Sequence, residues 1–332
     1  MRRILGNLTC EEDWRHLLRP GPRQALPRRV LEAVSGAATL LRVFAEDGDR
    51  LWTPVPVDPA RVCEAAGLPR PLLESGDLRA LPPAADVLAW GRVDETSARV
   101  NHRCFAWSLA RELGCALPAA RMVESLADLA DHLDATGLTC WVVKAPFSAA
   151  GRERHIERRG AGLERPETRL AVERLFSQHG PLLFEPWLPR TEDLGCAAYL
   201  YTEDPRLASF HRQLVDDDGR FYGIELLPLS AIDLALTRTV EQVGEALRRA
   251  GYVGPFGVDA WRYRDERGTV RLNPLGEINA RMTFGLVARA LAERLGCGGR
   301  LVFGREVPRG ASNVPLLLPG TSGHAAWWEA TS

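Results

Sequence analysis

Residues 277–281 read Glu-Ile-Asn-Ala-Arg, and Asp259 stands eighteen residues before them. In an extended segment alternate residues point to the same face, so Glu277, Asn279 and Arg281 should project together. Carboxylate and amide oxygens are ligands that Mg²⁺ prefers, and an arginine fork binds phosphate oxygens. The row therefore predicts a divalent-cation site beside a phosphate chain, with Asp259 supplied by the preceding strand. An isolated Glu-x-Asn more often ends a strand with solvated groups, so other segments must supply the nucleotide site.

The composition is that of a globular protein. Of the 332 residues, 45% are hydrophobic and 26% charged, and the formal net charge is -1. This length predicts two or three subdomains, and the near-neutral charge provides no basic field for nucleic acid or an anionic membrane. The seven cysteines are scattered without metal-like spacing, which suggests reduced thiols. Without a signal-like or membrane-length apolar run, we expect a cytoplasmic protein.

The only lysine is a second informative feature. Of 42 basic residues, 41 are Arg and one is Lys, at position 144. Since Lys is a compact point charge and Arg a broad fork, Lys144 is expected where a guanidinium does not fit. It ends a β-rich segment, 139–144, and precedes the small-residue loop 145–152, whose backbone N–H groups could approach phosphate oxygens. The alternative is an ordinary turn beside a lysine retained by chance.

Periodicity predicts a mixed α+β chain. One helix is expected over 97–114, ended by Gly114. The last ten residues are expected to be loose, and the tryptophans near the C-terminus to lie in the core. Further helices are predicted at 124–136, 165–179, 231–250 and 284–295, and strands at 139–144, 181–188, 197–201, 208–215, 221–227, 257–263 and 269–272.

These segments, in this order, resemble the ATP-grasp superfamily of carboxylate–amine ligases over about residues 95–300. The motifs that carry the resemblance are Val142-Val143-Lys144, Phe184-Glu185-Pro186-Trp187-Leu188, Gly257-Val258-Asp259 and Glu277-Ile278-Asn279-Ala280-Arg281. The resemblance implies an α+β (mixed α/β) ATP-grasp fold, in which two α+β lobes enclose ATP behind a small α/β N-terminal domain. The implied boundaries are 1–95 for the N-terminal domain, 96–186 for the first lobe with a mobile lid, and 187–325 for the second lobe with the metal site.

The resemblance also implies roles for individual residues. Asp259, Glu277 and Asn279 would hold Mg²⁺ or Mn²⁺, while Arg281 and Arg212 would stabilise a tetrahedral oxyanion. Residues implied to bind ATP are Arg103, Lys144, Ser148, Gly151, Arg152, Glu185, Trp187, Leu188 and Glu192, with main-chain groups of Glu185 and Leu188 at the adenine and Glu192 at the ribose.

Several alternatives stay open at these positions. Arg281 could instead pair with Asp259 or Glu277, and Glu192 could be a solvated acid. His211 and Arg212 alternate on one strand, so only one of them can face the site. The sequence also departs from the family's pattern: the loop has a single Gly, and the connection between Gly268 and Glu277 is long, so residues 273–276 are expected to bulge.

The implied activity is ADP-forming ligation of a small-molecule carboxylate to an amine through an acyl phosphate. Amino acids or peptides are the expected substrates, with neither nucleic acid nor membrane as a partner and a homodimer as the assembly considered. Two alternatives remain, namely a phosphotransferase of the same fold and a non-catalytic ATP-binding regulatory module. Residues 1–95 have no assigned chemistry.

Overall fold

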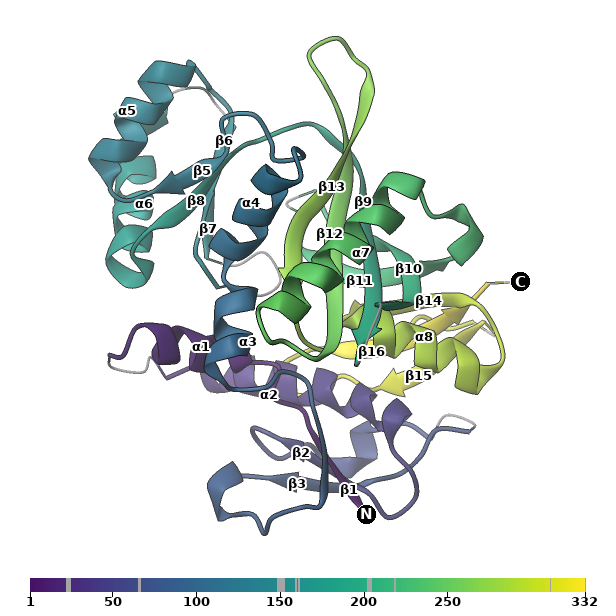
Figure 1. The fold of residues 1–332 in the computed structure, drawn as a ribbon. Helices are drawn as coiled ribbons and strands as arrows, with labels where there is room; N and C mark the ends of the chain where they lie inside the picture. The colour runs from purple at the N-terminus through teal and green to yellow at the C-terminus, as the bar shows by residue number, and fades with distance from the viewer. Residues whose placement is uncertain are drawn as a thin grey trace.

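The computed structural model describes residues 1–332 except 22–24, 65–66, 148–152, 159, 161, 202–204, 218, 311 and 332. The described residues form three β-sheets with helices packed against them (Figure 1). In this part of the chain no helix is both long and apolar enough to cross a membrane.

The N-terminal sheet is parallel, with strand order β3-β2-β1-β4. Ile4 and Leu51 are fully buried in its middle strands, as expected where helices or loops cover both faces of a parallel sheet. The elements are β1 (Arg2–Leu5), α1 (Cys10–Leu18), α2 (Arg28–Ala38), η1 (Thr39–Phe44), β2 (Arg50–Thr53), η2 (Pro59–Arg61), β3 (Leu72–Ser75), η3 (Leu78–Ala80) and β4 (Asp86–Ala89). We call this unit the N-terminal domain.

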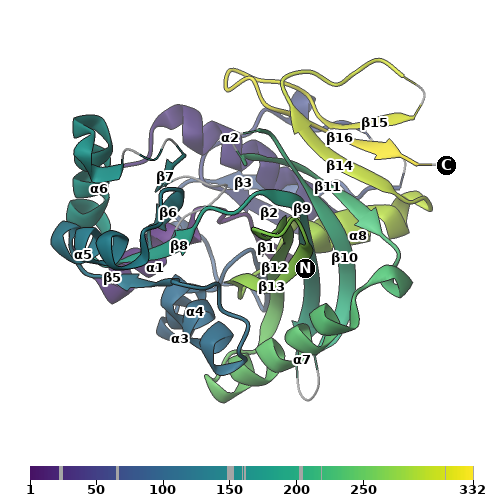
Figure 2. The same cartoon turned by 90° about the horizontal axis from the view of Figure 1, so that it is seen from above.

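The second sheet has the order β5-β8-β6-β7 and is antiparallel. One of its faces packs against two helices in a separate core that includes Val143, Phe184 and Val172. The elements are β5 (Arg121–Val123), α5 (Leu126–Thr136), β6 (Trp141–Lys144), β7 (Arg154–Glu157), η4 (Gly162–Glu164), α6 (Pro166–His179) and β8 (Leu182–Pro186). We call it the small lobe; Figure 2 shows it beside the largest sheet.

The largest sheet has eight strands in the order β13-β12-β9-β10-β11-β14-β16-β15. Helices α7 and α8 cover opposite faces, since Cys196 and Ala198 of β9 share a core with α7, whereas Ala197 between them packs with α8. The elements are β9 (Arg190–Leu200), β10 (Arg206–Val215), β11 (Phe221–Leu227), η5 (Leu229–Ala231), α7 (Leu234–Arg249), β12 (Gly254–Arg264), β13 (Val270–Asn279), α8 (Phe284–Leu295), β14 (Gly299–Gly304), β15 (Asn313–Leu317) and β16 (Ala325–Ala330).

The N-terminal domain is joined closely to the eight-stranded sheet. Val62 forms an antiparallel bridge with Leu317, and the Arg294 guanidinium donates to the carbonyl oxygens of Val43 and Ala45 at 2.8 and 3.0 Å. A single hydrophobic core contains Leu51 and residues of α8, β14 and β16. In Figure 2, α2 lies beside β14, β15 and β16.

The structure corrects two predictions. The helix expected over 97–114 is two helices, α3 (Glu95–Asn101) and α4 (Arg103–Glu112). The backbone turns at His102, whose ring Nδ1 accepts a hydrogen bond from the Cys104 N–H and caps α4. Of the last ten residues, which were expected to be loose, Ala325–Ala330 form β16, which pairs with β14 and β15 and buries Trp328 completely. That burial agrees with the expected core role of the C-terminal tryptophans.

The bulge expected in the connection before Glu277 is confirmed. On β12 a single residue separates Asp259 from Trp261, but their β13 partners, Glu277 and Asn273, are separated by three. The extra residues let β13 bend so that Gly276 lies against the Trp261 ring. A methyl group at Gly276 would come within 1.7 Å of that ring, so only glycine fits.

His211 is buried inside the eight-stranded sheet, beneath α8. Its Nδ1 lies 3.1 Å from the Ser209 hydroxyl, and its ring packs between Gly195 and Gly285. A methyl group at Gly195 would lie 2.3 Å from the ring, and one at Gly285 would lie 2.4 Å from it. Burial lowers the pKa of His211 to about 4, so the folded protein keeps this ring neutral.

This burial predicts an acid-sensitive stability. Between pH 6.5 and 4 the unfolded chain binds a proton at His211 that the folded chain rejects, so the free energy of unfolding falls as the pH falls. The shift corresponds to a loss of about 3 kcal/mol by pH 4. Urea denaturation at pH 7 and 4.5 measures how far the free energy of unfolding falls between the two pH values. This fall should be smaller for His211→Gln than for the wild type or the exposed-site control His324→Gln. An equal loss in all three would contradict the prediction.

Candidate functional site

Asp259 and Glu277 lie directly opposite each other on β12 and β13. Two amides donate to the Asp259 carboxylate, Gln213 Nε2 at 2.6 Å and Asn279 Nδ2 at 3.0 Å. The structure thus brings the three predicted metal ligands together on one face of the sheet, and adds Gln213. Gln213 follows His211 by two residues on β10, but no motif in the sequence singled it out.

The charge at this position fits a divalent cation. Burial, followed by the negative charge of Glu277, raises the pKa of Asp259 to about 7. Two carboxylates with an adjacent amide oxygen are the donor set that a hard cation prefers. Among the described residues no three His, Cys, Asp or Glu side chains converge, so the third candidate ligand is the Asn279 amide.

The end of β13 is held by a side chain from α3. Asn101 accepts a hydrogen bond from the Ala280 N–H at 2.8 Å and donates to the Ala280 carbonyl oxygen at 3.2 Å. This two-point contact satisfies the backbone immediately after Asn279, where the ladder with β12 ends. It fixes the direction in which Asn279 and Glu277 project.

Two buried basic side chains lie near Asp259, Glu277 and Asn279, and one of them contacts Glu277. Arg103, at the start of α4, places Nη2 3.1 and 3.2 Å from the two Glu277 carboxylate oxygens and also donates to the Ala145 carbonyl. Lys144, at the end of β6, pairs with the buried Glu185 carboxylate. Burial lowers the pKa of Lys144 despite that partner, so this cation lies in a region short of water.

Trp261 of β12 has two cations over its ring, and no motif in the sequence singled it out. The Lys144 ammonium lies 5.5 Å from the centroid of its ring and the Arg190 guanidinium 3.9 Å. Arg190 also donates to Asp193 at 2.7 Å. Trp261 follows Asp259 by two residues, so period-two alternation could have placed it on the same face.

The segment after β8 joins the small lobe to β9. The main-chain N–H of Trp187 donates to the Cys140 carbonyl oxygen at 3.0 Å. The centroid of the Trp187 ring lies 5.0 Å from the Arg158 guanidinium and 5.7 Å from that of Arg190. Leu188 is partly buried beside it. These residues lie next to Arg190, which stacks on Trp261, so the predicted hinge and the site are contiguous.

Glu192 and Arg212 lie away from this site, contrary to prediction. Arg212 stands opposite Leu194, which packs in the core with α7, whereas Asp259 stands opposite Gly195. Side chains at adjacent positions of a strand point to opposite faces, so Arg212 and Asp259 are on different faces. Arg212 donates to Glu192 at 2.8 and 3.0 Å and also pairs with Glu225, so its charge is compensated on that face.

Arg281 is close to the row but has another partner. Its guanidinium lies 3.2 Å from the Glu11 carboxylate of α1 and 5.3 Å from the centroid of the Trp90 ring. Burial alone would lower the pKa of Arg281, but the charge of Glu11, together with those of Glu277 and Asp259, raises it. The predicted alternative of pairing with Asp259 or Glu277 is therefore not what the structure has. Ser148, Gly151 and Arg152 lie outside the described residues.

Comparisons with known proteins identify this architecture. No family model matches the sequence, and no curated protein matches it significantly. A solved phosphoribosylamine–glycine ligase from Thermotoga maritima aligns over 99% of this chain and 90% of its own, at TM-score 0.56 and 13% identity. An N5-carboxyaminoimidazole ribonucleotide synthetase from Thermus thermophilus aligns over 99% and 93%, at TM-score 0.56 and 15% identity. Both are ATP-grasp proteins. The chain has the ATP-grasp fold.

A third match was solved with a nucleotide. The N5-carboxyaminoimidazole synthase from Aspergillus clavatus, in complex with ADP and 5-aminoimidazole ribonucleotide, aligns over 99% of this chain and 93% of its own. Its TM-score is 0.53 and the identity is 10%. At such identities the matches establish the fold, and the chemistry of this chain has to be argued from its own residues.

The contact between Gly276 and Trp261 yields a prediction for this ATP-grasp chain. Gly276→Ala should lower the free energy of unfolding by about 1–3 kcal/mol, because the new methyl group overlaps the Trp261 ring. Urea denaturation of Gly276→Ala, Trp261→Leu and the double variant should show that the smaller side chain relieves much of that cost. Gly21→Ala is the control, because no described residue other than its chain neighbours lies within 4 Å of the added methyl. A Gly276→Ala variant as stable as the wild type would contradict the close contact.

Proposed function

We propose that this protein is an ADP-forming ligase that joins a carboxylate to an amine through an acyl phosphate. The observation that carries the proposal is the opposed pair Asp259 and Glu277 in an ATP-grasp fold, with Arg103 bonded to Glu277 and Lys144 of the small lobe over the ring of Trp261, two residues after Asp259. A partly buried acidic pair near two buried cations suits a metal-bound triphosphate better than an uncharged ligand.

The chain's own residues would position ATP as a substrate. Lys144 would leave Glu185 and donate to phosphate oxygens. Arg103 would donate hydrogen bonds both to the γ-phosphate and to Glu277. The Trp261 ring would form one wall of the site, and the segment at Trp187 and Leu188 would bind the adenine. When bound, Mg²⁺ held by Asp259, Glu277 and Asn279 would neutralise phosphate charge and orient the triphosphate.

The reaction would proceed in two steps. A substrate carboxylate oxygen attacks the γ-phosphorus, the bond between this phosphorus and the β,γ-bridging oxygen breaks, and ADP leaves. An amine nitrogen then attacks the acyl carbon, inorganic phosphate leaves with the electrons of the C–O bond, and the amine proton passes to solvent. Arg281, whose charge interacts with Glu277 and Asp259, would stabilise the oxyanion, whereas Arg212 is omitted because it lies on the other face of the sheet.

The deciding experiment measures ADP release with amino acids supplied singly and in pairs. Amine-dependent ADP release, with a new amide product seen by mass spectrometry, supports the ligase. Amine-independent release with a stable phosphorylated product would replace the proposal with a phosphotransferase. Nucleotide binding by calorimetry without turnover on any pair would favour a regulatory module.

Two substitutions test the site itself. Lys144→Ala should weaken ATP binding about tenfold or more, because a buried charge-assisted contact to phosphate is lost. Lys144→Arg should not restore binding, since the broader guanidinium does not fit beside Glu185 and Trp261. Arg249→Ala, an exposed position on α7, is the control for lost positive charge. Calorimetric titration with a non-hydrolysable ATP analogue compares the four proteins, and equal affinities would contradict the assignment of Lys144.

Glu277→Gln tests the metal set separately. The substitution keeps the size of the side chain and removes one negative charge, so turnover should fall at least about a hundredfold. Nucleotide affinity should stay within a fewfold of wild type, because Lys144 and the adenine-binding segment are unchanged. Wild-type ADP release by Glu277→Gln would exclude Glu277 as a metal ligand.

A further inference from the structure

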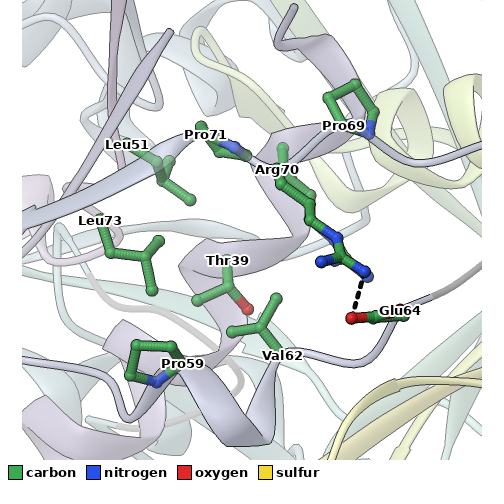
Figure 3. Close-up of a pocket in the computed structure, with 10 residues that line it drawn as sticks. Thr39, Leu51, Pro59, Val62, Glu64, Pro69, Arg70, Pro71 and Leu73 are labelled. Carbon is green, nitrogen blue, oxygen red and sulfur yellow. Dashed lines mark ion pairs between the residues drawn. The ribbon is translucent and has the colours of Figure 1, made fainter. Parts of the chain in front are cut away.

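A cavity of about 190 Å³ lies within the N-terminal domain. It is bounded by η1, by strands β2 and β3, and by residues 59–64 and 69–71 (Figure 3). Six of the ten side chains that line it are apolar: Leu51, Pro59, Val62, Pro69, Pro71 and Leu73. None of the residues assigned above to ATP or metal binding lines it. The cavity is therefore separate from the proposed active site.

One wall of this cavity carries a buried charge. Arg42 of η1 is only 3% exposed, and its Nη2 donates to the Cys63 carbonyl oxygen at 2.8 Å. Among the described residues no carboxylate forms an ion pair with it. A buried guanidinium with one backbone partner has donors left over for an anion.

The surroundings favour an added negative charge. Burial lowers the pKa of Arg42, and the charge of Arg70 acts in the same direction, against an opposing effect of Cys63. In Figure 3 the side chain of Arg70 turns toward Glu64, with which it forms an ion pair. Both members of that pair are more than half exposed, so the pair is weak and Arg70 can exchange its partner.

We propose that this cavity binds a small organic carboxylate with an apolar body. The planar carboxylate matches the Arg42 fork, and the apolar body matches the walls formed by Leu51, Val62 and Leu73. Arg70 at the opening adds a second contact when it leaves Glu64. A phosphate dianion fits less well, because a single buried fork compensates one charge and the walls offer few donors.

One wall of the cavity is also in contact with the eight-stranded sheet. The segment that forms one wall pairs with the edge of the eight-stranded sheet through the bridge of Val62 with Leu317. The Cys63 N–H donates to the Leu316 carbonyl oxygen at 3.2 Å, and the Leu318 N–H donates to the Arg61 carbonyl oxygen at 2.8 Å. A ligand against Val62 and Arg42 therefore touches a segment shared by the N-terminal domain and the large sheet.

The test uses the full-length protein and ligand-observed saturation-transfer NMR. The probes are sodium isovalerate and sodium benzoate, with isovaleramide and benzamide as neutral counterparts of the same shape and inorganic phosphate as the alternative anion. The acids should bind saturably, and the amides about tenfold more weakly or not at all. Arg42→Gln, which keeps an amide donor for the Cys63 carbonyl, should weaken the acids by about tenfold.

A second variant tests the proposal without removing a buried side chain. Glu64→Gln removes the acid that competes for Arg70, so the carboxylates should bind more tightly than to wild type, by about threefold. Thermal melting and affinity for an ATP analogue should be unchanged in both variants. The proposal is overturned if neither acid binds, if the amides bind as well as the acids, if phosphate binds and the acids do not, or if Arg42→Gln retains wild-type affinity.

Discussion

The structure depends on one electrostatic constraint, two partly buried carboxylates held face to face on neighbouring strands. Asp259 and Glu277 occupy paired positions of neighbouring strands, and the pKa of Asp259 is raised because burial and the nearby charge both disfavour its ionised form. Like charges in a region of low dielectric cost free energy unless other groups compensate them. The compensating groups reach the pair from strands and helices distant in sequence, so the constraint organises much of the fold around it.

Each compensating group has its own support. The amides of Gln213 and Asn279 donate to Asp259. Arg103 donates from one nitrogen to Glu277 and from another to the Ala145 carbonyl oxygen of the small lobe. Arg281 adds a positive charge nearby but is held by Glu11 of the N-terminal domain. All three parts of the molecule thus contribute to one charge arrangement, although the small lobe has a hydrophobic core of its own.

Local patterns explain why much of this could be predicted from the sequence. Period-two alternation placed Glu277 and Asn279 on one face, and the isolated Lys144 stood out because every other basic residue is Arg. The bulge before Glu277 was visible as extra length. The sequence could not reveal which face Glu192 occupies, because that depends on the register between β9 and β12. The partner of Arg281 was equally hidden, since Glu11 lies 270 positions away and on another domain.

The same limit applies to the chain's C-terminal end. Its last strand was missed because Ala325–Ala330 has few residues, and its stability comes from pairing with β14 and β15 and from burial of Trp328. Trp261 was missed for another reason, because the β12 pattern drew attention to Asp259 alone. Tertiary pairing decides such positions, and no window of the sequence contains it.

The joint between the N-terminal domain and the large sheet has a mechanical consequence. One continuous apolar core, the bridge of Val62 with Leu317 and the Arg294 hydrogen bonds make these two parts a single stiff body. The small lobe keeps a core of its own, and the contacts described above between its β6 end and that body are hydrogen bonds and cation–π contacts. Bending along the line between β6 and β12 lets charged groups exchange partners there, while Phe147, just after β6, is an apolar side chain that ties this end of the small lobe to the shared core.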